Sequence, residues 1–283
     1  MPGIVTTPSG AAPTAGPAEK RGYNLFLLLV AGLGGLLYGI DVGIIGGAYP
    51  YLEATSHLSP AQLSVIVAAV LLGSVISTLF AGVLADWMGR KPLMILSGAA
   101  FALSIPVIAL SPGYEFLFLG RLLQGISAGL VGIVVPLYLA ECLAASRRGK
   151  GTCGFQLLLT LGIVAAALMG MYFSYRVDEV TRTASAAALF AFKDHAWRSI
   201  FWVSLPPGLL FVFGSFFVTE SPRWLYRRGR RDQALNALLR SRSATQAALE
   251  LREMDENTQP RTHQNAGSKV RESLLKRKYV VPF

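Results

Sequence analysis

The chain alternates between long apolar stretches and short polar segments. A helix that crosses roughly 30 Å of hydrocarbon at 1.5 Å per residue needs about 20 apolar residues. Stretches of this kind predict membrane-spanning helices at Leu25–Gly47, Leu63–Ala85, Leu93–Leu110, Phe116–Leu139, Phe155–Phe173 and Ile200–Val218. The first is too long for the apolar region of a signal peptide and contains Asp41. The pattern therefore predicts an all-α polytopic membrane protein with six transmembrane helices and short additional helices.

The distribution of Lys and Arg predicts how these spans are oriented. Cytoplasmic loops of membrane proteins carry an excess of basic residues, and short loops are the informative ones. Three short segments on one side carry Lys20, Arg21, Arg90, Lys91, Arg147, Arg148 and Lys150, whereas the first two loops on the other side carry neither Lys nor Arg. We therefore expect an integral plasma (inner) membrane protein whose N-terminus and residues after 222 are cytoplasmic.

The segments outside the spans divide the chain into four expected regions. Residues 1–22 read as a disordered cytoplasmic tail, and 23–222 as the six-helix bundle, with 174–198 as a longer outer loop. Residues 223–275 read as a cytoplasmic helical region, because Ala and Leu recur at helical spacing in 230–240 and 244–254. Residues 276–283, a basic cluster followed by apolar residues, resemble the start of a truncated seventh span.

Composition excludes several other classes of protein. The chain is 53% hydrophobic and 15% charged, with mean hydropathy +0.48, so too few charges exist to coat a water-facing surface. The net charge of +10 is spread by segment, which argues against a nucleic-acid partner. Two cysteines and three scattered histidines support neither a disulfide framework nor a metal site. We find no nucleophile–base pair, phosphate loop or cofactor motif, so we expect neither an enzyme nor a cofactor.

Two ionisable residues lie within predicted spans, where each costs about 3 kcal/mol on insertion scales. Asp41 lies in the outer half of the first span and Arg121 near the outer end of the fourth, so the two could meet at similar depth. One interpretation is a salt bridge that only pins two helices. The other is a proton site, because burial favours the neutral acid and a nearby guanidinium favours the carboxylate. Moving the guanidinium would then switch protonation.

Small and polar residues in the spans predict helix contacts. Glycines recur every fourth residue in the first and fourth spans, a spacing that lets helix backbones approach closely; they are Gly35, Gly39, Gly43 and Gly47, then Gly125 and Gly129. Gln156 in the fifth span indicates either an interhelical hydrogen bond or a ligand contact. By default, Tyr38 is a core or lipid-facing aromatic.

Several motifs go beyond physical pattern and resemble a known family. The segment Gly82-Val-Leu-Ala-Asp86-Trp-Met-Gly89-Arg90-Lys91 resembles the signature loop of the major facilitator superfamily. The chain is similar to the sugar porter family within it, which includes xylose–proton symporters and glucose facilitators. That resemblance rests on residues 34–43, Gly120-Arg121, 136–141, Arg148-Gly149, Gln156 and 220–225, and runs from about residue 25 to the end.

The resemblance implies roles for particular residues. Asp41 matches the acid that symporters use for proton coupling, and Arg121 matches its partner. Gln156 matches a sugar-contacting glutamine, and Tyr38 stands where an aromatic near the sugar is usual. A cytoplasmic gating network that closes the inner side is implied for Asp86, Arg90, Lys91, Glu141, Arg148, Glu220 and Arg223. The helices after Arg223 resemble the family's intracellular helical domain.

Two departures shape the functional expectation. Ile163 stands where xylose symporters have a second glutamine and some glucose carriers have Ile. Family members also have twelve spans in two halves, with the sugar between them, and this chain resembles the N-terminal half only. The leading hypothesis is therefore a truncated or fragmentary sugar–proton symporter whose partners are a small-molecule sugar, the proton and the lipid bilayer.

The missing C-terminal half, or a second copy in a half-size homodimer, would be needed to close the pathway. The alternatives are a passive sugar facilitator and a non-transporting membrane sugar sensor or interfering partner. A drug–proton antiporter is disfavoured by the motif at 220–225.

Overall fold

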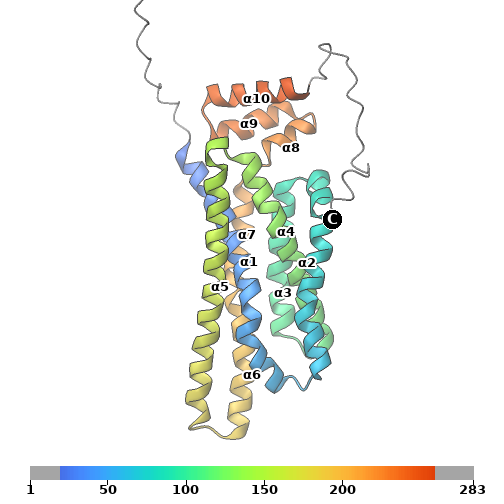
Figure 1. Cartoon of the computed structure of the whole chain (residues 1–283), viewed down its shortest axis with the longest axis vertical. Coiled ribbons are helices and arrows are strands. Elements are labelled where there is room, and N and C mark those ends of the chain that lie inside the picture. The colour runs from blue at the N-terminus through green and yellow to red at the C-terminus, as the bar shows by residue number, and fades with distance from the viewer. Residues whose placement is uncertain (1–19, 259–283) are drawn as a thin grey trace, which may run out of the picture.

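The computed structural model describes residues 20–258, and this part of the chain is helical with no strands (Figure 1). Residues 1–19 of the expected tail at 1–22 and the expected seventh span at 276–283 lie outside the described residues. The tail prediction is wrong for Arg21 and Gly22, which form the start of α1. The helices are α1 Arg21–Thr55, α2 Pro60–Met88, α3 Arg90–Ala109, α4 Tyr114–Cys142, α5 Ala145–Thr181, α6 Ala186–Val203, α7 Leu205–Phe217, α8 Pro222–Arg227, α9 Arg231–Ser241 and α10 Ala244–Thr258.

Within residues 20–258, six helices are long and apolar enough to cross a membrane, as the apolar stretches predict. The sixth, Ala186–Phe217, consists of α6 and α7, with a break at Ser204. Pro206 and Pro207 occupy the first turn of α7, where a missing backbone N–H costs least. The chain can therefore change direction at this point without leaving buried donors unpaired.

The prediction of a long outer loop at 174–198 is wrong. α5 continues to Thr181 and α6 begins at Ala186, so only four residues connect them. The Ser185 side chain accepts the backbone N–H of Ala188 and caps α6. Both helices extend past the apolar stretches because polar residues also sustain a helix outside the hydrocarbon.

Glycines bring two pairs of helices into close backbone contact. A Cβ at Gly39 of α1 would overlap the Leu159 carbonyl of α5, and one at Gly47 would lie 2.8 Å from the Cα of Gly170. A Cβ at Gly125 of α4 would overlap the Val70 carbonyl of α2. The expected close backbone approaches are therefore confirmed, and they pair α1 with α5 and α2 with α4.

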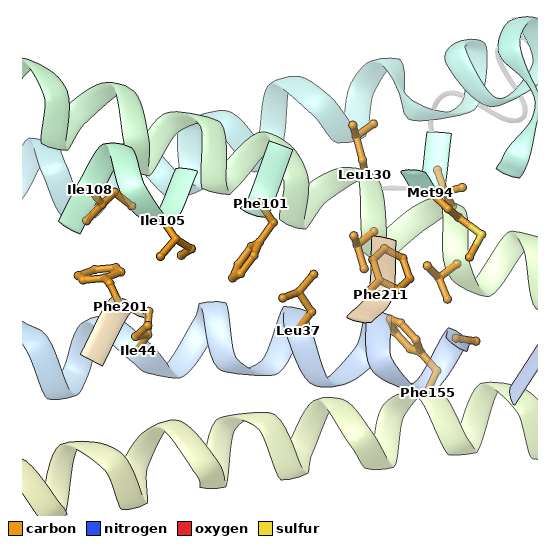
Figure 2. Packing of buried hydrophobic residues seen from close by; sticks show 14 of the residues in the cluster. Leu37, Ile44, Met94, Phe101, Ile105, Ile108, Leu130, Phe155, Phe201 and Phe211 are labelled. Carbon is orange, nitrogen blue, oxygen red and sulfur yellow. The ribbon is translucent and has the colours of Figure 1, made fainter. Parts of the chain in front are cut away.

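An apolar core joins α1 and α4 to α3, α6 and α7. Figure 2 shows Leu37 of α1 facing Phe101 of α3 and Ile44 of α1 beside Phe201 of α6, with Phe211 of α7 in the same layer. By contrast, α2 and α5 expose rows of large apolar side chains, which are Leu71, Leu79, Val83, Leu161, Val164 and Leu168 among others. Such surfaces suit contact with lipid or another apolar partner.

The three short helices α8, α9 and α10 gather at one end of the bundle (Figure 1), which we call the cap end. They share a small apolar cluster that includes Trp224, Leu238 and Leu251. Helices expected near 230–240 and 244–254 are confirmed as α9 and α10, whereas α8 was not anticipated. Its start signal was present, because Ser221 caps the helix and Pro222 follows it.

Buried polar contacts attach the cap to the bundle. Arg242, 2% exposed, donates to the Cys142 carbonyl at the end of α4 at 2.8 Å and pairs with Glu250 of α10. The amide of Asn24 in α1 donates to the Ser241 carbonyl at 3.1 Å. The cap is therefore bonded to both α1 and α4.

Candidate functional site

Asp41 lies halfway along α1 and is only 2% exposed. Among the described residues, neither of its carboxylate oxygens has a hydrogen-bond partner. An ionised carboxylate that is buried without partners is strongly disfavoured, so this position needs a proton or a counter-charge. The groups that could neutralise Asp41 therefore define the candidate site.

Arg121 of α4 is the counter-charge available to Asp41, and it is also 2% exposed. Its Nη1 donates to Oε1 of Gln124, one turn along the same helix, at 2.7 Å. Its guanidinium carbon lies 5.8 Å from the ring centroid of Phe201. Within the described part of the chain, Arg121 and Asp41 form neither a salt bridge nor a hydrogen bond. The pinning salt bridge is therefore not formed.

A cavity of about 200 Å³ lies between α1, α2 and α4 and joins the two charged residues. Tyr38 and Asp41 line it from α1, Arg121 from α4, and Val70 and Ser74 from α2. The structure thus brings together three of the five residues expected to bind the proton or the sugar. Tyr38 is half-buried, and its ring lies 3.3 Å from where a Cβ at Gly132 would stand.

Gln156 and Ile163 are placed elsewhere, on α5. Gln156 is exposed and its side chain makes no hydrogen bond to any described residue. The interhelical hydrogen bond that its sequence context favoured is therefore not found. Ile163 is half-buried, and its backbone faces Gly39 and Gly43 of α1. Neither residue lines the Asp41 cavity, because α5 packs on a different side of α1.

A second polar cluster lies at the cap end, around the guanidinium of Arg90. Arg90 is 2% exposed and bonds Oε1 of Glu141 at 2.9 Å and the Ala85 carbonyl at 2.9 Å. It also lies 3.1 Å from the exposed carboxylate of Asp86. The Ser221 hydroxyl donates to Oε2 of Glu141 at 2.5 Å. One arginine thus connects the end of α2, the start of α3, and α4.

Glu220 holds the α2–α3 turn from the opposite side. It accepts the backbone N–H groups of Arg90 at 2.9 Å, Lys91 at 3.2 Å and Ser221 at 2.7 Å. Burial raises the pKa of Glu220 above its ordinary value, although these hydrogen bonds oppose the rise. A Cβ at Gly89 would overlap this carboxylate, and the φ of Gly89 is +99°, so only glycine suits the turn.

Three further cap residues hold the same turn, and sequence reasoning missed them. Arg227 lies 3.4 Å from Glu141 and 3.6 Å from Asp86. The Trp224 indole donates to the Asp86 carbonyl at 2.9 Å, and Arg228 donates to the carbonyls of Asp86 and Trp87 at 2.8 and 2.7 Å. These are the last carbonyls of α2, which no backbone donor of that helix satisfies.

The other residues expected in this network take different positions. Lys91 donates through its Nζ to the Phe216 carbonyl at 2.7 Å instead of to a carboxylate. Arg148 and Arg223 line a polar pocket of about 540 Å³ between α4, α5 and the cap. Arg148 donates to the Leu143 carbonyl, and neither arginine forms a salt bridge with a described carboxylate. Asp86, Arg90, Glu141 and Glu220 are therefore the residues that the structure gathers around the turn.

Comparisons with known proteins agree with this architecture. The galactose-proton symporter of Escherichia coli is 30% identical over 242 residues, covering 85% of this chain and 48% of that protein. The arabinose-proton symporter of Escherichia coli is 32% identical over 232 residues, covering 82% and 45%. A structure of the major facilitator superfamily proton:xylose symporter XylE, bound to 6-bromo-6-deoxy-D-glucose, aligns with TM-score 0.71 at 26% identity, covering 83% of this chain and 53% of that chain.

The chain spans about half the length of the curated relatives it matches. The likeness to XylE confirms the expected fold class, the six-helix half of a major facilitator fold. A family model described as "Sugar (and other) transporter" matches residues 27–282. This match covers nearly the whole chain, which therefore belongs to the sugar (and other) transporter family.

Proposed function

We propose that this chain forms the proton-coupling half of a sugar–proton symporter, with Asp41 as the proton acceptor and Arg121 as its counter-charge. The observation that carries the proposal is the buried carboxylate of Asp41, which has no hydrogen-bond partner among the described residues and shares a cavity with Arg121. A proton or a guanidinium can neutralise this carboxylate, and alternation between the two states is what coupling requires.

The sugar would bind outside the Asp41 cavity, against the face that α1 and α5 present. Gln156 is an exposed amide at the start of the apolar stretch of α5, and Ile163 lies two turns further along the helix. Tyr38 borders the Asp41 cavity on α1 and would link proton binding to sugar binding. The second wall of the pathway would come from a matching half, since transporters of this architecture bind substrate at the interface between their repeats.

The polar cluster at the cap end would serve as the gate on the cytoplasmic side. Asp86, Arg90, Glu141 and Glu220 hold the α2–α3 turn, and Arg148 and Arg223 remain without carboxylate partners among the described residues. These two arginines would meet the matching half when the inner side closes. The excess of Lys and Arg in the short loops at this end supports a cytoplasmic position for the cap.

One proton supplies enough free energy for this task. A charge that crosses about 100 mV gains about 2.3 kcal/mol, and each pH unit adds about 1.4 kcal/mol. Together they support a sugar gradient of about 500-fold.

The test is uptake by a chimera in which this chain replaces the matching half of the Escherichia coli galactose-proton symporter. Proteoliposomes receive an inwardly directed proton gradient, and accumulation and exchange of radiolabelled galactose are measured separately. We expect Asp41→Asn to abolish accumulation and to spare exchange, because the neutral amide mimics the protonated acid but cannot release a proton.

The matched control is Asp178→Asn, which makes the same change at an exposed position near the end of α5 and should leave accumulation intact. Uphill accumulation that survives Asp41→Asn would overturn the assignment. A parent chimera that equilibrates galactose without accumulating it would favour the passive facilitator instead.

A further inference from the structure

We propose that Gln124 is a positioning residue that holds the Arg121 guanidinium on α4 and so competes with Asp41 for it. This inference rests on the proposed function, because it concerns how the Asp41 proton site is switched. Gln124 belongs to none of the motifs that predicted the site, and it lies one helical turn from Arg121 on the same helix.

The geometry fixes which end of the Gln124 amide faces the guanidinium. Arginine carries only donors, so the atom 2.7 Å from its Nη1 must be the amide oxygen. Gln124 is 0% exposed, and its Nε2 has no hydrogen-bond partner among the described residues. Among the described residues, the bond to the guanidinium is therefore the hydrogen bond that orients this buried amide.

Arg121 retains the capacity for another acceptor. Its Nε has no hydrogen-bond partner within the described part of the chain. The two carboxylate oxygens of Asp41 also have no partner there. Both side chains line the same cavity, so the guanidinium and the carboxylate share one space into which each can turn. We therefore infer two positions of the guanidinium. In one it is bonded to Gln124 and Asp41 can bind a proton, and in the other it is paired with the Asp41 carboxylate.

No other charged group complicates this competition. The core stretches of α2, α3, α5 and α7 (residues 60–85, 92–109, 154–175 and 205–217) contain no Asp, Glu, Lys, Arg or His. On α6, Arg198 is bonded to Asp194 and to the carbonyls of Ala109 and Ser111, and His195 contacts Ser199. Among described residues, the titratable and charged side chains lining the cavity are those of Tyr38, Asp41 and Arg121.

The experiment is an infrared pH titration of the full chain in lipid nanodiscs. The carbonyl stretch of the protonated Asp41 carboxyl is isolated by subtracting, for every variant, the spectrum of the same variant carrying Asp41→Asn. Gln124→Met keeps the side-chain length and removes the acceptor, so the guanidinium is free to pair with Asp41. We expect the midpoint of Asp41 protonation to fall by about one pH unit.

Gln124→Glu provides the opposite change at the same position. A carboxylate one turn from Arg121 would hold the guanidinium more tightly on α4, so the Asp41 midpoint should rise. The added carboxylate also repels Asp41 directly, so the fall in Gln124→Met is the shift that a purely structural role of Gln124 would not produce. Gln233→Met, the same exchange at an exposed position of α9, should leave the midpoint unchanged.

The outcomes separate the two proposals. If Asp41 titrates but its midpoint does not fall in Gln124→Met, the role of Gln124 is refuted and the proton site stands, whatever the shift in Gln124→Glu. If no Asp41-dependent carbonyl band titrates, the proton site fails and the role of Gln124 fails with it. Should Gln124→Met not fold, Gln124→Asn replaces it, because its shorter side chain withdraws the acceptor from the guanidinium.

Discussion

Glu220 carries its charge at a place where burial and hydrogen bonding oppose each other. Burial raises the pKa of Glu220 above its ordinary value of 4.5, against the effect of three backbone N–H donors. A group whose pKa is raised by folding stabilises the fold fully below the unfolded pKa, and this contribution is lost as pH rises through the folded pKa.

We therefore expect the wild-type chain to lose unfolding free energy relative to Glu220→Gln as pH rises from about 4.5. The measurement is equilibrium unfolding of both proteins in detergent micelles across that pH range. Because all other carboxyl groups are shared, the difference between the two curves isolates Glu220. A difference that favours the wild type increasingly at higher pH would contradict the assignment.

At the scale of residues, some features of the site could be predicted from the sequence and others could not. Asp41 and Arg121 could be singled out because charges inside apolar stretches are costly, and they do line one cavity. Their missing salt bridge could not be foreseen, because it depends on which rotamer Arg121 adopts. The contribution of Gln124 depends on the same choice, although a glutamine one turn from a buried arginine is a usable signal.

At the scale of elements, Arg90 and Glu141 join three helices through one buried ion pair. The Arg90 side chain is 3% exposed and that of Glu141 10%. Removing one partner of a buried pair is much worse than removing both, because the remaining charge stays buried. We expect Glu141→Gln to lower the unfolding free energy by roughly 3 kcal/mol, measured by chemical unfolding in micelles.

The control for this prediction is Glu179→Gln. Glu179 pairs with Arg176 at 2.6 Å near the exposed end of α5, where both side chains are about half exposed. Exposed pairs of this kind contribute about 0–1 kcal/mol, so the control should be nearly neutral. Equal losses of unfolding free energy in the two variants would show that the buried pair stabilises the protein no more than the exposed pair does.

The helices could be predicted from the sequence where the thickness of the membrane determines their length. Apolar length gave all six spans, because crossing the hydrocarbon needs a fixed number of residues. Apolar length did not predict the residues at which each helix begins and ends. α5 has 37 residues and is about 55 Å long, well beyond the hydrocarbon thickness, and its polar last turns carry no apolar signal. α8 was missed because six residues are too few for a helical period to register.

At the scale of the whole molecule, the orientation proposed above can be tested with trypsin. Arg230 is exposed in the connection between α8 and α9, at the cap end, and Arg182 is exposed between α5 and α6 at the other end. With the cap in the cytoplasm, we expect cleavage near Arg230 in inside-out vesicles only. Cleavage near Arg182 should occur in right-side-out vesicles only. Mass spectrometry of the fragments checks both, and the reverse pattern would invert the proposed topology.

The contacts that Trp224 and Arg228 make with the last carbonyls of α2 also bear on the biosynthesis of the chain. The two partners are separated by 138 to 142 residues, so α2 and α3 leave the ribosome long before α8 exists. At cellular elongation rates this interval is on the order of ten seconds. During that time the last carbonyls of α2 lack these two donors, whereas Arg90 can already pair with Asp86 and Glu141. The cap can therefore complete this turn only after the six spans have been synthesised, because α8 follows α7 in the chain.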